Sequence, residues 1–180
     1  NYVKDWKETH GSKAIGYLPV YVPREIIHAH GMLPVGIMGG GDNLEIIRGD
    51  AYFQSYICHL PRSVIELGVA GKLDCLDGVL FPAICDVIRN LSGMWKMEFP
   101  DKYVNYLDFP QNFSAAGRDF YLKEIRQMSE DFEKISGNKV TPAELNQSIR
   151  LYNENRRAIQ DLYSLSSEMP TLALTFEVYL

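Results

Sequence analysis

Long hydrophobic stretches are missing from this 180-residue sequence. No run of about 18 apolar residues could span a membrane, and no signal-peptide pattern opens the chain. A basic stripe is missing too, and the net charge of −5 argues against a nucleic-acid partner. The three cysteines are odd in number and widely spaced, which favours free, catalytic or metal-bound thiols over a secreted disulfide framework. We therefore expect a cytoplasmic protein that binds neither nucleic acid nor a membrane.

Common catalytic motifs are also missing. The sequence has no Walker loop, no GxSxG and no HExxH, so it carries no nucleotide-binding motif of its own. His28 and His30 lie two positions apart in a predicted helix, where they face different ways and do not form a metal site. His59, beside Cys58, could act as a ligand or as a hydrogen-bond donor, although a single histidine is more often structural.

The composition is that of an ordinary soluble domain. Hydrophobic residues make up 46% of the chain and charged residues 23%, and the length suits one domain with an appendage. The chain begins at Asn1 and ends at Leu180 without a polar tail. We expect it to be part of a longer protein.

Four short apolar segments are predicted strands: residues 14–20, 33–38, 77–81 and 102–107. Helices are expected to begin at Pro23, Pro61 and Pro82, because proline suits the first position of a helix. A strand–helix–strand order implies parallel pairing with a right-handed crossover. Residues 93–100 read as a loop, and residues 1–13 as an irregular lead-in or the end of an earlier helix. The pattern predicts an α/β fold built on a parallel sheet.

The pattern changes after residue 110. Apolar residues recur at steps of four, three, four and three from Tyr121 to Ile135, which predicts an amphipathic helix ending at Gly137. Residues 141–144, Thr-Pro-Ala-Glu, form a capping box that opens a second helix. The pair is either a helical hairpin or an insertion between two α/β halves. The division is therefore an α/β domain over 1–110, a helical segment over 111–170 and the start of a further domain at 171–180, where the pattern fits a strand or a helix.

Two of the cysteines lie where a predicted strand gives way to a predicted helix. A helix N-terminus offers unpaired amides and partial positive charge to Cys58 and Cys85, which stabilises a thiolate and suits an anionic iron–sulfur cluster. Cys75 precedes strand 77–81 and is expected at the opposite end of the sheet, in a structural role. The 27-residue spacing from Cys58 to Cys85 is unlike the tight runs of ferredoxins, so buried structural cysteines remain the stronger reading from the residues alone.

One loop is rich in glycine. Residues 39–41 are all glycine and follow the second predicted strand. Such a loop either lets backbone amides approach an anion or simply turns the chain, and the second is the commoner case. Asp42 follows directly.

Three motifs resemble one known family. Residues 16–35, residues 55–63 (Ser-Tyr-Ile-Cys-x-x-Pro-Arg-Ser) and residues 76–86 (Leu-Asp-Gly-Val-x-Phe-Pro-x-x-Cys-Asp) resemble motifs of the 2-hydroxyacyl-CoA dehydratase and benzoyl-CoA reductase family, in the family's order. The resemblance covers most of the chain. Within the family it is most similar to the paired substrate-binding subunits (B/C type) of ATP-dependent benzoyl-CoA reductase, as an N-terminal fragment.

The resemblance implies a cofactor and a partner. Family subunits contain two Rossmann-like or flavodoxin-like units and pair as a heterodimer of homologous subunits. Each subunit holds a [4Fe–4S] cluster through three cysteines, of which Cys58 and Cys85 match the first two. The third would lie in an α/β unit beyond this chain, so domain 1–110 would be the cluster-bearing one.

The resemblance also implies a reaction. Low-potential electrons would pass to the aromatic ring of benzoyl-CoA, a CoA thioester, in anaerobic aromatic degradation. Separate cluster-containing ATPase subunits would hydrolyse the ATP, and reduced ferredoxin would supply the electrons. The alternatives are a 2-hydroxyacyl-CoA dehydratase subunit and a non-catalytic electron-carrying α/β subunit. Dehydratases take acid–base residues from the loops after the first two strands. Here these loops hold residues 18–20 and 39–43, and their only carboxylate, Asp42, is our candidate catalytic residue.

Overall fold

The computed structural model describes residues 2–41 and 44–168. The chain divides into two compact units, Asn1–Lys139 and Val140–Leu180. Asp42 and the expected further domain at 171–180 lie outside the described residues. No helix in the described ranges is long and apolar enough to cross a membrane.

The first unit is built on a four-stranded sheet. The strands are β1 (Ala14–Tyr17), β2 (Leu33–Gly36), β3 (Gly78–Pro82) and β4 (Tyr103–Leu107). All three pairings are parallel, and the strand order is β2-β1-β3-β4. This order matches the first four strands of the flavodoxin-like arrangement. The prediction of an α/β fold with a parallel sheet is confirmed.

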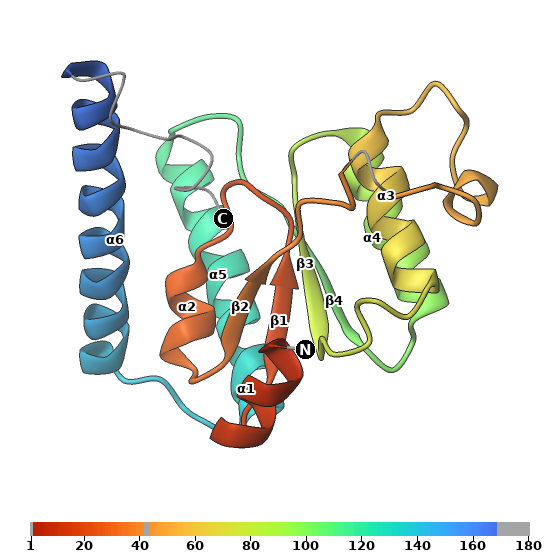
Figure 1. The fold of residues 1–180 in the computed structure, drawn as a ribbon. Coiled ribbons are helices and arrows are strands. Elements are labelled where there is room, and N and C mark those ends of the chain that lie inside the picture. Colours follow the sequence, from red (N-terminus) through yellow and green to blue (C-terminus); the bar gives the residue numbers. More distant parts are fainter. Residues whose placement is uncertain (1, 42–43, 169–180) are drawn as a thin grey trace. The chain divides into compact units, whose positions relative to one another are not determined.

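Helices cover both faces of this sheet (Figure 1). The helices of the first unit are α1 (Tyr2–His10), α2 (Arg24–Ala29), α3 (His59–Val69), α4 (Asp86–Glu98) and α5 (Ala115–Ser136), with a short 3₁₀ helix, η1, over Gly49–Ala51. Helices α2 and α5 lie on one face, and α3 and α4 on the other. Strand β3 extends two residues past the end of β1, because the last β1–β3 pair is Tyr17 with Leu80 and β3 continues to Pro82.

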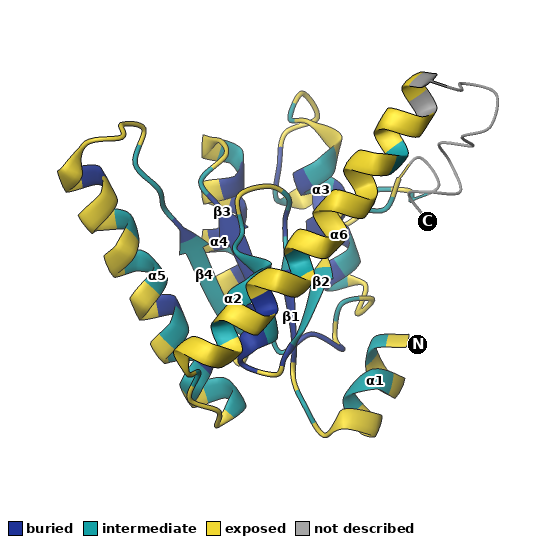
Figure 2. Ribbon diagram, turned by 90° about the vertical axis from the view of Figure 1, so that its left-hand side faces the viewer, coloured by how far each residue is buried: buried dark blue, intermediate teal, exposed yellow. Residues whose placement is uncertain are grey.

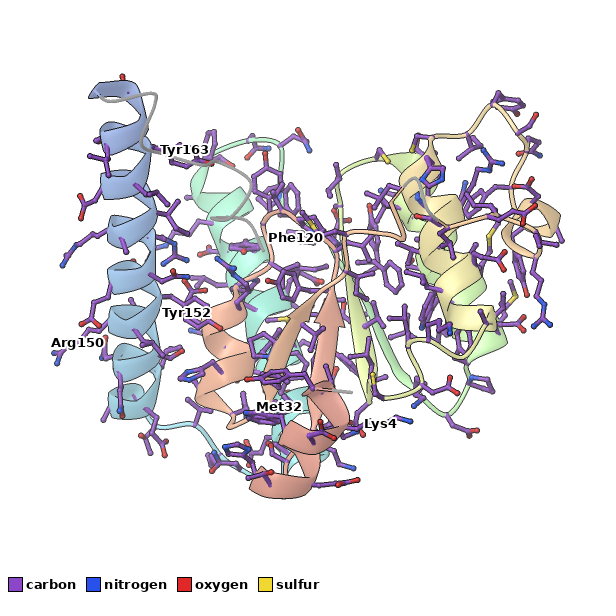
Figure 3. All side chains as sticks on the ribbon, viewed as in Figure 1. Lys4, Met32, Phe120, Arg150, Tyr152 and Tyr163 are labelled. Carbon is purple, nitrogen blue, oxygen red and sulfur yellow. The ribbon has the colours of Figure 1, made fainter. Side chains whose placement is uncertain are left out.

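Strand β3 is the centre of the core, and every residue in it is buried (Figure 2). Its side chains alternate between the faces, as a strand requires. Val79 and Phe81 join the cluster formed with α3 and α4, whereas Leu80 joins the cluster formed with α2 and α5. Met32, labelled in Figure 3, belongs to the second cluster and is almost fully buried.

Helix boundaries differ from the predicted ones at proline. Pro61 lies in the first turn of α3, two residues after its start, where a missing N–H costs no hydrogen bond. Pro82 ends β3 instead of opening α4, which begins at Asp86. Of the two readings for residues 1–13, the structure has the helix, α1.

The loop predicted over residues 93–100 is wrong. Helix α4 continues to Glu98, through Gly93. A Cβ at Gly93 would meet nothing within 4 Å, so this glycine lies on the open side of the helix. Leu91 and Trp95 keep the buried face continuous across it. The burial of these large side chains outweighs the cost of about 1 kcal/mol that an interior glycine imposes.

The two C-terminal helices end and begin as predicted. Helix α5 stops at Gly137, whose φ of 72° gives the left-handed C-cap. Helix α6 (Pro142–Glu168) belongs to the second unit. Its capping box forms: the Thr141 N–H donates to Glu144 Oε2 at 2.7 Å, and the Glu144 N–H donates to Thr141 Oγ1 at 3.3 Å. Met128 and Phe132 of α5 are buried in the first unit's core. Two further expectations stay predictions: that the two helices form a hairpin or an insertion, and that the α/β domain ends at residue 110.

Candidate functional site at the carboxyl edge of the sheet

The carboxyl ends of the four parallel strands lie at one edge of the sheet, which is the upper edge in Figure 1. Four connections leave this edge, toward α2, α3, α4 and α5. Open α/β sheets bind their ligands at this edge, next to the point where the strand order reverses. Here that point lies between β1 and β3.

Cys58 and Cys85 are the N-cap residues of α3 and α4. Both are exposed, and neither forms a disulfide. Neither side chain makes a capping hydrogen bond to its own helix. The expected position at a helix start is therefore found for both cysteines. In this chain both thiols are exposed, unlike the buried cysteines of the structural alternative.

The two helices that these cysteines cap are close neighbours. A Cβ on Gly68 of α3 would lie 2.6 Å from Trp95 of α4, so the backbone of α3 approaches the indole as closely as glycine permits. Both helices start at the carboxyl edge and run back along the same face of the sheet (Figure 1). The partial positive charges of their N-termini therefore lie at the same edge as the two thiols.

This donor set fits part of an iron–sulfur site. Such a cluster takes cysteine thiolates as ligands and is tuned by hydrogen bonds to sulfur and by solvent exposure. Cys58 and Cys85 offer two exposed thiols, each beside the free amides of a helix N-terminus. Within the described ranges, no group of three or more His, Cys, Asp or Glu side chains could hold a metal ion. The two exposed thiols therefore do not form a complete metal site among the described residues.

Cys75 lies elsewhere, as expected. It precedes β3, whereas Cys85 follows that strand, so the two residues lie at opposite edges of the sheet. Cys75 is only 9% exposed and is part of the core cluster. Lys7 Nζ donates a hydrogen bond to its carbonyl oxygen at 2.9 Å.

A buried carboxylate fixes the loop that leads to Cys58. Glu66 of α3 is 6% exposed. Its Oε2 accepts the N–H groups of Ile47, Arg48 and Gly49 at 3.0, 2.7 and 2.7 Å. Three amides on one carboxylate oxygen form a strong, charge-assisted anchor. Because Glu66 and Cys58 belong to the same helical element, this anchor ties the loop to the helix that carries the thiol.

An ion pair fixes the next part of the same loop. Arg62 of α3 pairs with Asp50 at 2.5 Å and donates to the carbonyl oxygen of Ser55 at 3.3 Å. Sequence reasoning missed both anchors. The available signal was a glutamate inside the apolar run of α3, where Val64, Ile65 and Gly68 are buried.

The glycine loop serves packing in the described structure. The Gly40 N–H donates to Ser63 Oγ at 3.4 Å, and a Cβ on Gly39 would clash with that hydroxyl. Gly39 and Gly40 therefore pass close to the first residues of α3, including Leu60 and Ser63. An anion-binding role of the loop stays a prediction. The candidate acid–base residue, Asp42, lies outside the described residues.

His30, the C-cap residue of α2, is buried against α5 and the loop that follows it. His30 is 2% exposed. Its Nδ1 lies 2.8 Å from the carbonyl oxygen of Asn138, and its Nε2 lies 2.9 Å from Ser129 Oγ. The ring of His30 therefore contacts Ser129 of α5 and the carbonyl oxygen of Asn138, which lies two residues beyond the end of that helix.

An open cleft of about 850 Å³ lies at the same carboxyl edge. It is lined by Tyr21 of the β1–α2 loop, Ala83 and Ile84 of the β3–α4 loop, residues 109–114, and Gly117, Arg118 and Tyr121 of α5. Burial, and to a lesser extent the charge of Glu25, raises the pKa of Tyr121, so its hydroxyl stays neutral at physiological pH. Ile84 directly precedes Cys85, so the cleft borders the candidate cluster ligand. No sequence pattern pointed to this cleft.

These features define an α/β protein with two exposed cysteines and an open cleft at one edge of its sheet. The chain matches the family described as 2-hydroxyglutaryl-CoA dehydratase, D-component, over residues 19–180, and it belongs to that family. The resemblance drawn from the three motifs is confirmed.

Individual relatives sharpen this placement. The chain is 57% identical over 179 residues to a benzoyl-CoA reductase subunit of Thauera aromatica, covering 98% of the chain and 46% of that protein. It is 33% identical over 170 residues to the (R)-phenyllactyl-CoA dehydratase beta subunit of Clostridium sporogenes, covering 94% and 45%. It is 35% identical over 164 residues to the beta subunit of (R)-2-hydroxyglutaryl-CoA dehydratase of Acidaminococcus fermentans, covering 90% and 43%. The chain spans less than half of each relative.

Proposed function

We propose that this chain is the cluster-bearing part of a benzoyl-CoA reductase subunit, which passes low-potential electrons to the aromatic ring of benzoyl-CoA. The observation that carries the proposal is the placement of Cys58 and Cys85 as exposed N-caps of two neighbouring helices. The 57% identity to a benzoyl-CoA reductase subunit supports the choice of substrate, since the dehydratase relatives are more distant at 33 and 35%.

Cys58 and Cys85 would hold a [4Fe–4S] cluster together with a third cysteine from the remainder of the subunit. When bound, such a cluster supplies one-electron chemistry at low potential. The chain's own residues stabilise the thiolates and position Cys58. The N-termini of α3 and α4 stabilise the negative charge of the thiolates, and Glu66 and Arg62 hold the loop that delivers Cys58.

The partners follow from the same proposal. The protein would pair with a homologous subunit as a heterodimer in the cytoplasm, and would take electrons from separate cluster-containing ATPase subunits. Only those ATPase subunits would bind ATP, and reduced ferredoxin would supply them with electrons. The exposure of both thiols is consistent with a site that other parts of the complex complete.

Substrate turnover tests the proposal. The complete subunit pair, with its ATPase partner, is assayed without oxygen on benzoyl-CoA and on a 2-hydroxyacyl-CoA. We expect ATP-dependent reduction of benzoyl-CoA and no dehydration of the hydroxy compound. Dehydration in place of reduction would move the protein to the alternative function. Transfer of electrons with turnover of neither substrate would make it a non-catalytic electron-carrying subunit.

The dehydratase alternative depends on Asp42. Dehydration needs a proton acceptor near the acyl chain, and Asp42 is the only carboxylate in residues 18–20 and 39–43, which follow the first two strands. In a dehydratase, changing Asp42 to Asn would abolish turnover. In a reductase that uses Asp42 to deliver a proton to the ring, the change would lower kcat and leave the electron transfer to the cluster intact.

A further inference from the structure

The cleft at the carboxyl edge has aromatic walls. Tyr21 and Phe109 meet edge to face, with ring centroids 5.1 Å apart and an interplanar angle of 68°. Phe113, on the same loop as Phe109, is fully exposed to solvent. Flat ring surfaces gathered around an open cavity are a binding surface for another flat ring.

Tyr21 is held in an unfavourable backbone conformation. Its φ of 68° lies in the left-handed region, and it is the only residue other than glycine with positive φ in the described ranges. Bulky side chains avoid this region, and such strain gathers at ligand sites where the surroundings enforce it. The strained backbone turns this ring toward Phe109 at the mouth of the cleft.

Hydrogen bonds hold the loop over residues 109–114, which carries Phe109 and Phe113, in place. Asn112 Oδ1 accepts hydrogen bonds from the N–H and the hydroxyl of Ser114 at 3.2 and 2.6 Å, and Ser114 Oγ accepts the Gly117 N–H at 3.1 Å. A Cβ on Gly117 would lie 2.6 Å from the carbonyl oxygen of Asn112. The loop over 109–114 is therefore packed closely onto the first turn of α5 and is formed before any ligand arrives.

One cation lines the cleft. Arg118 lies in the first turn of α5, and its guanidinium forms no ion pair with any residue in the described ranges. The N-terminus of this 22-residue helix adds positive potential at the same place. An arginine of this kind is suited to a phosphate, which it can bind through two parallel hydrogen bonds.

The two ends of a CoA thioester differ in charge. Its acyl end is uncharged, whereas its nucleotide end combines a flat adenine ring with phosphates. A cleft that joins aromatic rings to an unpaired arginine matches the nucleotide end. We propose that this cleft binds the phosphoadenosine end of the acyl-CoA, with the adenine against Tyr21 and Phe109 and a phosphate on Arg118. This inference rests on the proposed function and extends it to a second part of the substrate.

Truncated ligands test the inference. The complete subunit pair is titrated with benzoyl-CoA, with CoA and with S-benzoylpantetheine, which lacks the nucleotide, and dissociation constants are measured by calorimetry. Arg118→Ala is expected to raise the dissociation constants of benzoyl-CoA and CoA by about tenfold, because one charge-assisted contact is lost. The dissociation constant of S-benzoylpantetheine should not change. Phe109→Leu is expected to act in the same direction, and Arg118→Lys to restore part of the loss.

Arg126→Ala provides the matched control, because Arg126 is an exposed arginine of the same helix that does not line the cleft. Circular dichroism checks that each variant folds. Unchanged binding of benzoyl-CoA by Arg118→Ala and Phe109→Leu would overturn the inference. If these variants weakened the binding of S-benzoylpantetheine as much as that of benzoyl-CoA, the inference would also be overturned, because the cleft would then hold the acyl end. A wild-type protein that binds neither benzoyl-CoA nor CoA would overturn the proposed function itself.

Discussion

Cys58 and Cys85 occupy the same structural position, the N-cap, in two helices that pack against each other on one face of the sheet. Their places follow from two strand-to-helix connections at one edge of a parallel sheet. A cluster bound there would contact two helix N-termini at once, and their amides would favour its negative charge. The residues that hold these connections in place are therefore the first targets for mutation.

Glu66→Ala is expected to lower the free energy of unfolding by about 3 kcal/mol, because it leaves three amides of residues 47–49 without their acceptor. Urea denaturation of the complete protein measures the change. Glu45→Ala is the control, since Glu45 is exposed near the same loop and its removal should cost less than about 0.5 kcal/mol. Equal stability of the two variants would mean that Glu66 is no anchor.

Gly68→Ala is expected to destabilise the protein by about 1–3 kcal/mol, because the new methyl group would lie 2.6 Å from Trp95 and push α3 away from α4. The same substitution at Gly93 of α4 provides the control. A Cβ there meets nothing within 4 Å, so Gly93→Ala should stabilise the helix by about 0.5–1 kcal/mol. Thermal unfolding compares the two, and a stabilising Gly68→Ala would show that the helices tolerate a wider spacing.

Asp77→Asn tests an ion pair at the amino edge of the sheet. Burial acts to raise the pKa of Asp77, but the hydrogen bond and charge of Lys7, the Ala14 N–H and the charge of Lys13 outweigh it and lower that pKa. A carboxyl group whose pKa is lowered by folding stabilises the folded protein at a pH above its pKa in the unfolded chain, about 3.9. This stabilisation is lost as the pH falls through the lower pKa of the folded protein.

The wild-type protein should therefore exceed Asp77→Asn in stability by about 1 kcal/mol at pH 7. The gap should close as the pH falls below about 4 toward the lowered pKa. Unfolding free energies measured from about pH 7 to about pH 2.5 check both statements. A gap that stays constant over this range would show that the charge of Asp77 makes no contribution.

The fold was predictable because its signals are local. Four apolar segments separated by helical stretches are enough to predict a parallel sheet, and the capping box at 141–144 marks the start of α6. Errors fell where packing overrides local preference. Gly93 would end an isolated helix, but the buried Leu91 and Trp95 on either side of it keep α4 continuous.

The site was predictable only in part. Pro61 and Pro82, each three positions from a cysteine, placed Cys58 and Cys85 near helix starts without long-range information, although Pro82 itself ends β3. The anchor of Glu66 joins residues 17 to 19 positions apart, and the cleft joins Tyr21 to Phe109 across 88 positions. Such contacts depend on how the elements pack in three dimensions, and a single sequence carries no periodic signal for them.

Iron content tests the central claim most directly. The complete subunit pair is purified without oxygen as wild type and with Cys58→Ser, Cys85→Ser or Cys75→Ser in this protein, and iron and acid-labile sulfide are measured. We predict that Cys58→Ser and Cys85→Ser each remove the iron and sulfide bound by this protein, whereas Cys75→Ser, at the opposite edge of the sheet, keeps the wild-type amount. Wild-type iron in the Cys58 and Cys85 variants would contradict the assignment of these two residues as cluster ligands.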